Sequence, residues 1–275
     1  MKEKSYIFSE KDASLTVRHA LRRLSSYLGI GIAEKIMFER RLIRTQLNVR
    51  KVKKLGSDGF AIESSENCCE ILISANTSEG IANGIHELLR TLMLKGLRDP
   101  FKITWNMWAK PYFKVRGVVL GCYNFGLPEL TPDMWTLENW KEYIDFLRLM
   151  NINLITCLFV YAYHQEIPQT ERYKWRYETL RNAMKYGQEL GIKFHFAYVY
   201  NYAPQALWWK HPELRAQGTP GYYGISFCWH RAKSEILKLH RGNMEFFKGL
   251  DGYQLMYLEG CGLCICPECS KSLSR

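Results

Sequence analysis

The sequence predicts an α/β protein of two domains: a small α+β domain over residues 1–107, then a partial (β/α)8 TIM barrel over residues 108–275. At the usual size of about 150 residues per domain, 275 residues correspond to about two domains. Hydrophobic residues make up 47% and charged residues 24%, which allows a buried core and excludes disorder, collagen-like repeats and a coiled coil. From residue 111 onward strands alternate with helices, which predicts βαβ units and a parallel sheet.

Two amphipathic helices and two or three short strands are predicted in the first domain. Ser9 or Ser14 caps the first helix, Gly29 ends it, and Gly96 follows the second helix. The expected elements are a helix over residues 14–28, strands over 60–63 and 70–75, a helix over 77–94, and a linker or edge strand over 100–111.

About four βα units are predicted in the second domain. The expected strands cover residues 115–121, 153–163, 192–200 and 253–258, and the expected helices cover residues 135–150, 177–190 and 231–247. An eight-fold barrel takes about 250 residues, so the barrel is truncated, its sheet is open, or another chain completes it. Unpaired edge strands invite pairing, and we therefore expect self-association or a partner that completes the barrel.

Polar and aromatic residues follow the predicted strands at their carboxyl ends, where a (β/α) barrel carries its active site. His164, Tyr200 and Asn201 are candidate contacts to substrate hydroxyl groups, although a single histidine at a strand end is also a common structural residue. Trp229 follows the third strand. Its ring suits stacking on the apolar face of a sugar or on a base, and the alternative is that it packs the loop onto the barrel.

Glu259 lies at the carboxyl end of the fourth predicted strand and is the candidate general acid. Cleavage of a glycosidic bond needs a proton delivered to the leaving oxygen. A carboxyl group among Tyr257, Leu258 and further apolar neighbours is expected to have a raised pKa and to keep its proton near neutrality. Glu166 is a candidate second carboxylate. The alternative is that Glu259 only caps a strand.

Arg116 lies on a strand of otherwise apolar residues, among them Val115 and Val118, so it must be paired or bind something. Its planar set of donors suits two adjacent sugar hydroxyls or a carboxylate. Arg116 is therefore a candidate substrate-binding residue. The alternative is an internal ion pair, for example with Glu259.

Four of the nine cysteines crowd the C-terminus in the pattern Cys261-x2-Cys264-x-Cys266-x2-Cys269. Such close thiols predict a metal site, with zinc favoured over an iron–sulfur cluster. The loop is short, and wrapping one metal ion with all four thiols is sterically demanding: either only three ligate it, or a distal residue assists. A closed thiolate site implies a structural zinc. Without a metal the four are thiols or disulfides, and the other five cysteines, Cys228 among them, are expected to be reduced.

The chain carries 38 Lys and Arg against 27 Asp and Glu, a formal net charge of +11. This charge is compatible with nucleic-acid binding, but no helix-turn-helix or RNA-binding signature accompanies it, so nucleic acid is not an expected partner. Residues 1–5 lead into polar sequence without an apolar signal region. The longest apolar run, over residues 154–163, is too short for a membrane span. We therefore expect a cytoplasmic protein with no membrane partner.

The order of these features resembles the family 20 β-hexosaminidases and related barrels, including the α-glucuronidases. The stretch from Lys110-Pro111 to Arg116-Gly117 resembles the opening of their barrel. Residues 69–92, with two glycines in the helix, resemble the accessory domain that precedes it.

This resemblance implies a hexosaminidase-type accessory domain over residues 1–107 and the N-terminal half of a glycoside hydrolase barrel over residues 108–275, ending in a cysteine-rich loop. It implies that Arg116 binds the sugar in the subsite before the cut bond and that Glu259 is the general acid. The family has an Asp directly before this acid, which orients the acetamido group of the substrate, whereas this chain has Leu258. The implied substrate is a carbohydrate containing an amino sugar or a uronic acid.

Three functions are compatible with these features. The first is a β-N-acetylhexosaminidase-like glycosidase, a hydrolase of O-glycosidic bonds. The second is a carbohydrate-binding or structural barrel fragment without turnover. The third is a metal-stabilised protein that binds nucleic acid. We take the first as the prediction, and hydrolysis that is lost in Glu259→Gln would select it over the others.

Overall fold

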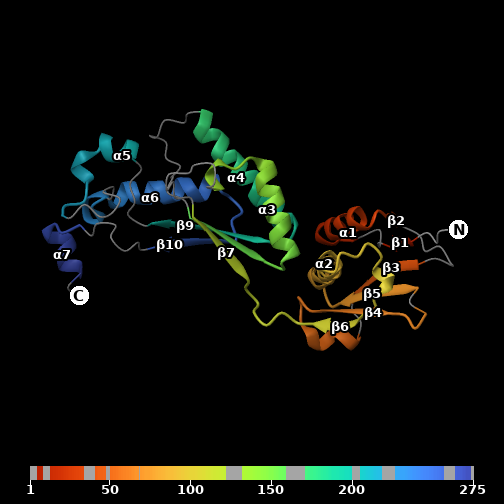
Figure 1. The fold of residues 1–275 in the computed structure, drawn as a ribbon. Helices are drawn as coiled ribbons and strands as arrows, with labels where there is room; N and C mark the ends of the chain where they lie inside the picture. Colours follow the sequence, from red (N-terminus) through yellow and green to blue (C-terminus); the bar gives the residue numbers. More distant parts are fainter. Residues whose placement is uncertain are drawn as a thin grey trace. The chain divides into compact units, whose positions relative to one another are not determined.

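The computed structural model divides the chain into two compact units, each combining a sheet with helices (Figure 1). The structure describes residues 5–8, 13–33, 41–47, 50–67, 69–121, 132–158, 171–199, 205–218, 227–256 and 264–273. Unit 1 contains residues 1–116, 143–153 and 188–192, and unit 2 contains residues 117–142, 154–187 and 193–275. The expected mixed α/β class is confirmed.

Unit 1 is built on a six-stranded sheet of order β2-β1-β3-β5-β4-β6. Its strands are β1 (Ser5–Phe8), β2 (Gly31–Ala33), β3 (Arg41–Leu47), β4 (Phe60–Ser64), β5 (Glu70–Ala75) and β6 (Asn106–Ala109). Its other elements are α1 (Leu15–Leu28), α2 (Ser78–Leu94) and the 3-10 turns η1 (Arg50–Leu55) and η2 (Pro100–Lys102). β1, β2, β3 and β5 are parallel, whereas β4 is antiparallel to β5 and β6. The predicted linker or edge strand thus contains the edge strand β6.

Both helices of unit 1 begin at capping residues of the expected type. Ser14 caps α1 by accepting a hydrogen bond from a backbone N–H of the first turn, and Gly29 ends this helix with a φ of 69°. Thr77 caps α2 by accepting a hydrogen bond from the N–H of Gly80. A Cβ at Gly80 would lie 2.5 Å from the carbonyl oxygen of Gly59, so glycine permits this close approach of α2.

The core of unit 1 lies between the sheet and the two helices. Its central side chains are Ile71 and Ile73 of β5 and Ile81, Ile85 and Leu88 of α2. They follow the two-residue period of a strand and the helical period of α2, as the sequence predicts. A second, smaller cluster places Val52 and Leu55 of η1 against Ala61 of β4.

A buried polar group lies on α2 within unit 1. His86 is 1% exposed, and neither of its ring nitrogens has a hydrogen-bond partner among the described residues. Burial is the main reason that the pKa of His86 lies well below its usual value, and the charges of Arg148, Arg23, His19 and Arg90 lower it further. His86 is therefore neutral in the folded chain at neutral pH.

We expect the stability of unit 1 to fall as the pH drops below about 6.5. In that range the unfolded chain binds a proton at His86 that the folded chain does not bind, so the free energy of unfolding decreases by up to about 1.4 kcal/mol per pH unit. His86→Leu is expected to remove this slope. Urea unfolding of both proteins at about pH 7.5 and about pH 5.5 measures it. The same pH dependence in both proteins would rule out His86 as the cause.

Unit 2 contains a parallel sheet with four described strands in the order β10-β9-β8-β7. The strands are β7 (Gly117–Gly121), β8 (Leu154–Leu158), β9 (Lys193–Val199) and β10 (Gly252–Met256). The helices are α3 (Leu137–Leu149), whose last turns belong to unit 1, α4 (Glu171–Glu189), α5 (Gln205–Lys210), α6 (Trp229–Phe246) and α7 (Pro267–Leu273). The 3-10 turns are η4 (Pro132–Met134) and η5 (Pro212–Leu214). All four expected strands are confirmed over the residues that the structure describes, whereas residues 159–163, 200 and 257–258 of the expected ranges lie outside them. Helices α5 and α7 are elements that the sequence pattern does not predict.

Aromatic side chains bind helices to one face of this sheet. Phe196 of β9 stacks on Tyr253 of β10, with ring centroids 5.7 Å apart, and contacts Phe247 at the end of α6. Tyr177 of α4 meets Phe247 as well. The hydroxyl of Tyr253 lies 2.9 Å from a ring nitrogen of His240, and burial raises the pKa of Tyr253 to about 12. Both α4 and α6 therefore pack on this face.

The opposite face carries small and polar side chains. Val119, Thr156 and His195 lie in register across β7, β8 and β9, and the amide of Gln254 lies 3.2 Å from Nδ1 of His195. A closed barrel fills its interior with bulky branched side chains, whereas Val119 is 68% exposed. Among the described residues β7 and β10 each pair on one side only. The parallel sheet is thus established, and a partial TIM barrel remains a proposal.

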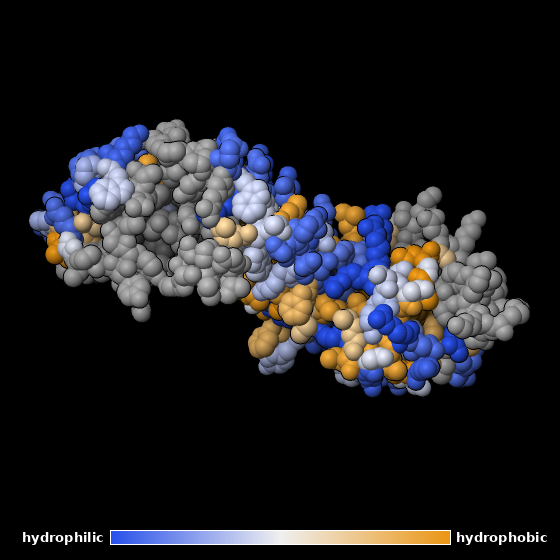
Figure 2. Space-filling model, turned by 45° about the horizontal axis from the view of Figure 1, so that its top comes forward, coloured by the Kyte–Doolittle hydropathy of each residue, from blue (hydrophilic) through white to orange (hydrophobic). Residues whose placement is uncertain are grey.

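Apolar side chains are also exposed at the surface, as Figure 2 shows for one face. Trp108 of β6 and the following Tyr112 and Phe113 are exposed, and the last two rings meet edge to face with centroids 4.9 Å apart. Exposed apolar surface of this kind often marks an interaction site. Within the described ranges no helix combines the length and the apolar character needed to cross a membrane.

Candidate functional site

The carboxyl ends of β7 to β10 define one edge of the sheet in unit 2, which we call the carboxyl edge. At the other edge, Gly117 pairs in register with Leu154, which pairs with Lys193. Met256, the last residue of β10, pairs with Val199, six residues beyond Lys193. At about 3.3 Å per residue, the carboxyl edge lies roughly 20 Å from the level of Gly117. The connection from β9 to α6 and the connection from β10 to α7 both leave from the carboxyl edge (Figure 1).

Four thiols meet in these two connections. Cys228 directly precedes α6, Cys264 and Cys266 precede α7, and Cys269 lies in the first turn of α7. The four Sγ atoms all lie within 4.8 Å of one another. The Sγ atom of Cys228 is 3.7 Å from the Sγ atoms of both Cys266 and Cys269. We call these four side chains the thiol cluster.

The spacing of the thiol cluster fits one metal ion. Four sulfurs about 2.3 Å from a zinc ion, at the corners of a tetrahedron, lie about 3.8 Å from one another. A disulfide would bring two sulfurs to about 2.05 Å, and the four cysteines are free. An iron–sulfur cluster of the 4Fe–4S type binds each of its four thiols to a different iron and therefore needs a wider spacing. The cluster could therefore hold a metal ion and is compatible with a structural zinc.

The charges of the thiol cluster favour a bound cation. Burial on its own would raise the pKa of Cys228, but hydrogen bonds from Arg231, Cys264 and Cys266 lower it to about 6. The pKa of Cys266 is raised to about 12, since the backbone N–H of Cys269 favours the thiolate but is outweighed by burial and the neighbouring sulfurs. Like charges this close cannot all be present unless a cation neutralises them. The cluster thus offers one ready thiolate and three more that a metal would deprotonate.

Donors around the thiol cluster hold its sulfurs in place. The N–H of Gln217 donates to Sγ of Cys264 at 3.3 Å, and the N–H of Cys269 donates to Sγ of Cys266 at 3.5 Å. Arg231 of α6 donates to two backbone carbonyls of the segment that precedes Cys228, at 2.7 and 2.9 Å. Such outer contacts fix the orientation of metal ligands.

Three of the four predicted metal ligands are brought together: Cys264, Cys266 and Cys269. Cys261, the fourth, lies outside the described residues. The fourth sulfur of the cluster belongs to Cys228, which is a free thiol as expected but lies in the cluster and not apart from it. The sequence indicates Cys228 only indirectly, because the shortness of the loop from Cys261 to Cys269 suggests a distal ligand but does not identify the residue.

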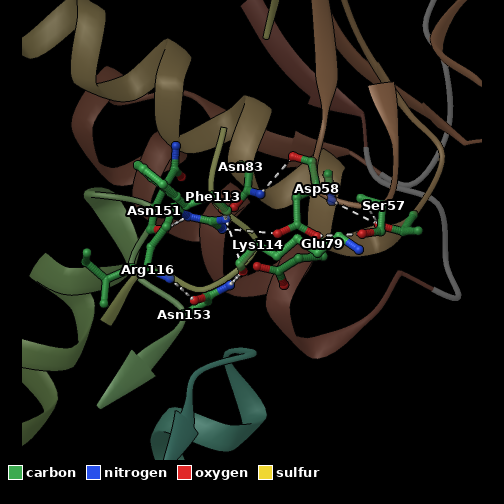
Figure 3. A network of polar contacts seen from close by, with 12 residues as sticks. Ser57, Asp58, Glu79, Asn83, Phe113, Lys114, Arg116, Asn151 and Asn153 are labelled. Atoms are coloured by element: carbon green, nitrogen blue, oxygen red, sulfur yellow. Dashed lines mark hydrogen bonds and ion pairs between the residues drawn. The ribbon is translucent and has the colours of Figure 1, made fainter. Parts of the chain in front are cut away.

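Arg116 is the last residue before β7 in the sequence and belongs to unit 1 (Figure 3). Its Nε donates to the carbonyl of Asn151 and its Nη1 to the carbonyl of Phe113, both at 2.7 Å. Its Nη2 pairs with Asp58 at 3.1 Å. The predicted internal ion pair is therefore present, with Asp58 as the partner in place of Glu259. No described contact supports the predicted role of Arg116 in sugar binding.

Two asparagines shape the backbone around Arg116 (Figure 3). Asn153 accepts a hydrogen bond from the N–H of Arg116 and donates to the carbonyl of Lys114, both at 2.8 Å. Asn151 has a φ of 57°, in the left-handed region that asparagine tolerates, and this aims its carbonyl at the guanidinium. Within unit 1, the network fixes the backbone around Arg116.

Replacing Arg116 with alanine is expected to lower the free energy of unfolding by about 2–3 kcal/mol, because several charge-assisted hydrogen bonds of a partly buried side chain are lost together. Arg44→Ala is the matched control. The ion pair of Arg44 with Glu70 is about one-third exposed and should contribute less than about 1 kcal/mol. Urea unfolding compares the two variants, and equal small losses would contradict a fixing role for the network.

Most residues of the predicted carbohydrate site lie outside the described part of the chain: His164, Tyr200, Asn201 and Glu259. Trp229 is described as the first residue of α6, directly after a cysteine of the thiol cluster, and it is 42% exposed. Among the predicted aromatic and polar sugar contacts, the structure thus describes Trp229, at the start of α6 and next to Cys228 in the sequence.

No protein-family model matches the chain, and no curated protein matches it by sequence. Solved structures do match it in fold. The GH20 β-N-acetylhexosaminidase from Streptomyces coelicolor A3(2) gives a TM-score of 0.64 at 12% identity, over 93% of this chain and 56% of that chain. An inactive mutant of the GH20 exo-β-N-acetylglucosaminidase from Vibrio harveyi gives 0.64 at 14% identity, over 99% and 46%. A GH138 enzyme described as targeting pectin rhamnogalacturonan II gives 0.63 at 15% identity, over 90% and 30%.

The fold resembles that of glycoside hydrolases. At identities of 12–15%, this likeness concerns the fold alone. The expected resemblance to family 20 is supported to that extent, and the GH138 enzyme extends it to a second family. The chain spans 30–56% of the length of these structures.

Proposed function

We propose that the chain is a carbohydrate-active domain of the glycoside hydrolase type that acts on O-glycosidic bonds. The observation that carries this proposal is the likeness in fold to glycoside hydrolases of two families, over 90–99% of this chain. The parallel sheet of unit 2 supports a ligand site at the carboxyl edge, because barrels and open α/β sheets bind their ligands there. The exposed ring of Trp229 adds a surface that suits stacking on a sugar.

Glu259 is the proposed general acid. It follows Met256, the last residue of β10, by three positions. A protonated carboxyl group at the carboxyl edge would deliver its proton to the leaving oxygen as the glycosidic bond breaks. His164, Tyr200 and Asn201 are the proposed contacts to sugar hydroxyls, since they follow β8 and β9 in the sequence. Arg116 is left out because its guanidinium is held by Asp58 and two backbone carbonyls.

The proposed substrate is a glycoside of a uronic acid or of an amino sugar. Two of the similar structures are enzymes of N-acetylated amino sugars, and the third is described as targeting pectin rhamnogalacturonan II. Leu258 stands where family 20 has the Asp that orients the acetamido group. Catalysis assisted by that group lacks its partner here. We therefore place uronic-acid glycosides first.

Turnover of a panel of para-nitrophenyl glycosides tests the proposed function. We expect release of nitrophenolate from at least one uronide or N-acetylhexosaminide. Binding of these sugars without release of nitrophenolate would favour a carbohydrate-binding role. The open sheet supports this alternative, because β7 and β10 each have one unpaired side among the described residues. Salt-dependent binding of random DNA, with neither sugar binding nor turnover, would overturn the proposal in favour of nucleic acid.

We also propose that further strands pair with the sheet of unit 2, from a second copy of the chain or from a partner that completes the barrel. In the part of the chain that the structure describes, β7 and β10 each have one unpaired side, which supports this. Light scattering during gel filtration measures the mass of the active species. A monomer with turnover would contradict the proposal.

The thiol cluster is the proposed site of one structural zinc ion. A site closed by four sulfurs keeps no open position for a substrate, so the ion would support the connections around it. Cysteines that form no disulfide suit a reducing compartment, and we therefore propose that the chain lies in the cytoplasm. We expect one zinc per chain in protein purified from zinc-supplemented cells. Elemental analysis measures it, and zinc-free protein would contradict the site.

A further inference from the structure

The thiol cluster joins two connections that leave the carboxyl edge separately. The connection after β9 ends at Cys228, where α6 begins. The connection after β10 supplies Cys264, Cys266 and Cys269. Cys228 is thus the one thiol of the cluster that comes from the first connection. An ion bound by all four sulfurs would bond to both connections at once.

The buried side chains between these two connections are mostly cysteines. The buried cluster at this point consists of Cys228, Cys264 and Cys266, with Ala216 and Cys269 packed against it. The backbone of Ile265 adds one hydrogen bond, from its N–H to the carbonyl of Gln217 at 2.7 Å. Five small side chains bury little apolar area, so their packing contributes little to holding the connections together.

Helix α7 depends on this junction. It has seven residues, and an isolated helix of that length is unstable in water. Cys266 directly precedes the helix and Cys269 lies in its first turn. Fixing these two sulfurs would therefore fix the start of α7.

We propose that the zinc ion is the cross-link that holds the β10–α7 connection against the start of α6, with Cys228 as its tether. This inference rests on the zinc site proposed above. Residues 257–263, which include Glu259, lie in the sequence between Met256 in the sheet and Cys264 in the cluster. The ion would fix the described end of this connection at Cys264. Removing zinc releases that end and α7 while the sheet stays folded.

Hydrogen exchange of the full chain, read by mass spectrometry, tests the cross-link. In zinc-loaded protein, backbone amides in 264–273 should be protected. Chelation of zinc, or Cys228→Ala, should lower that protection at least tenfold and leave β8, β9 and unit 1 unchanged. The matched control is Cys157→Ala, which removes a buried thiol of β8 outside the cluster and should leave 264–273 protected. Cys228→His keeps a zinc ligand and should restore protection.

The two proposals fail in different ways. A zinc-free wild-type chain overturns the zinc site itself. Zinc bound in the wild type, with protection of 264–273 unchanged by chelation, overturns the cross-link and leaves the zinc site standing. Faster exchange throughout Cys228→Ala would mean that this variant does not fold, and the chelated wild type then decides the outcome alone.

Discussion

Glu259→Gln is expected to lower kcat on an alkyl glycoside by about 10²–10⁴-fold, the usual contribution of a general acid. The amide fills the same space but has no proton to give to the leaving oxygen, so KM should change far less than kcat. A dinitrophenyl glycoside has a leaving group that departs without protonation, and its loss should be much smaller. Comparing kcat for the two substrates in wild type and variant measures the role of the acid directly.

The matched control for this substitution is Glu138→Gln. Glu138 lies on α3 with its side chain 75% exposed and pairs with Lys141 on the surface. Its replacement should leave kcat unchanged on both substrates. An equal loss on the alkyl and dinitrophenyl glycosides in Glu259→Gln would indicate a disturbed structure, and wild-type rates in that variant would exclude Glu259 as the acid.

A second large effect is expected at the ion pair of Glu79 and Arg148 in unit 1. The side chain of Arg148 is fully buried, and its Nη2 lies 2.8 Å from Oε1 of Glu79. Burial raises the pKa of Glu79, and the charge of Arg148 offsets part of that rise. Glu79→Gln leaves the buried guanidinium without its counter-ion. We expect it to lower the free energy of unfolding by about 3–5 kcal/mol.

A double-mutant cycle with Arg148→Met checks this prediction by urea unfolding. The double variant should lose less stability than the two single variants summed, because it leaves no unpaired charge in the core. Glu138→Gln, which breaks a surface pair, should cost less than about 1 kcal/mol. Losses that simply add would show that Glu79 and Arg148 do not act as a pair.

Local chemistry made much of the fold predictable. Ser14, Gly29 and Thr77 mark helix ends because capping depends on the residue itself and its near neighbours. The four strands of unit 2 follow from their apolar runs. Strand β3 was not predicted because the charged residues Arg41 and Arg44 interrupt its apolar pattern. Its position in the sheet depends on pairing with β1 and β5, which are distant in the sequence.

Two features of the candidate site depend on contacts between distant residues. The Sγ atom of Cys228 lies near thiols that are more than thirty residues further along the chain, and no ligand-spacing motif in the sequence predicts this proximity. Arg116 pairs with Asp58, whose Asp-Gly context indicates only a turn. In both cases the residue type showed that a partner was needed, whereas only the fold could identify the partner.

The central proposal is that a metal ion cross-links the connections at the carboxyl edge of unit 2, near a catalytic carboxyl group. A crystal structure with anomalous diffraction data collected above and below the zinc absorption energy tests it most directly. We predict one zinc peak about 2.3 Å from the sulfurs of Cys228, Cys264, Cys266 and Cys269, with the carboxyl group of Glu259 at the same edge of the sheet. Disulfides in place of the peak, or Glu259 directed away from that edge, would contradict the claim.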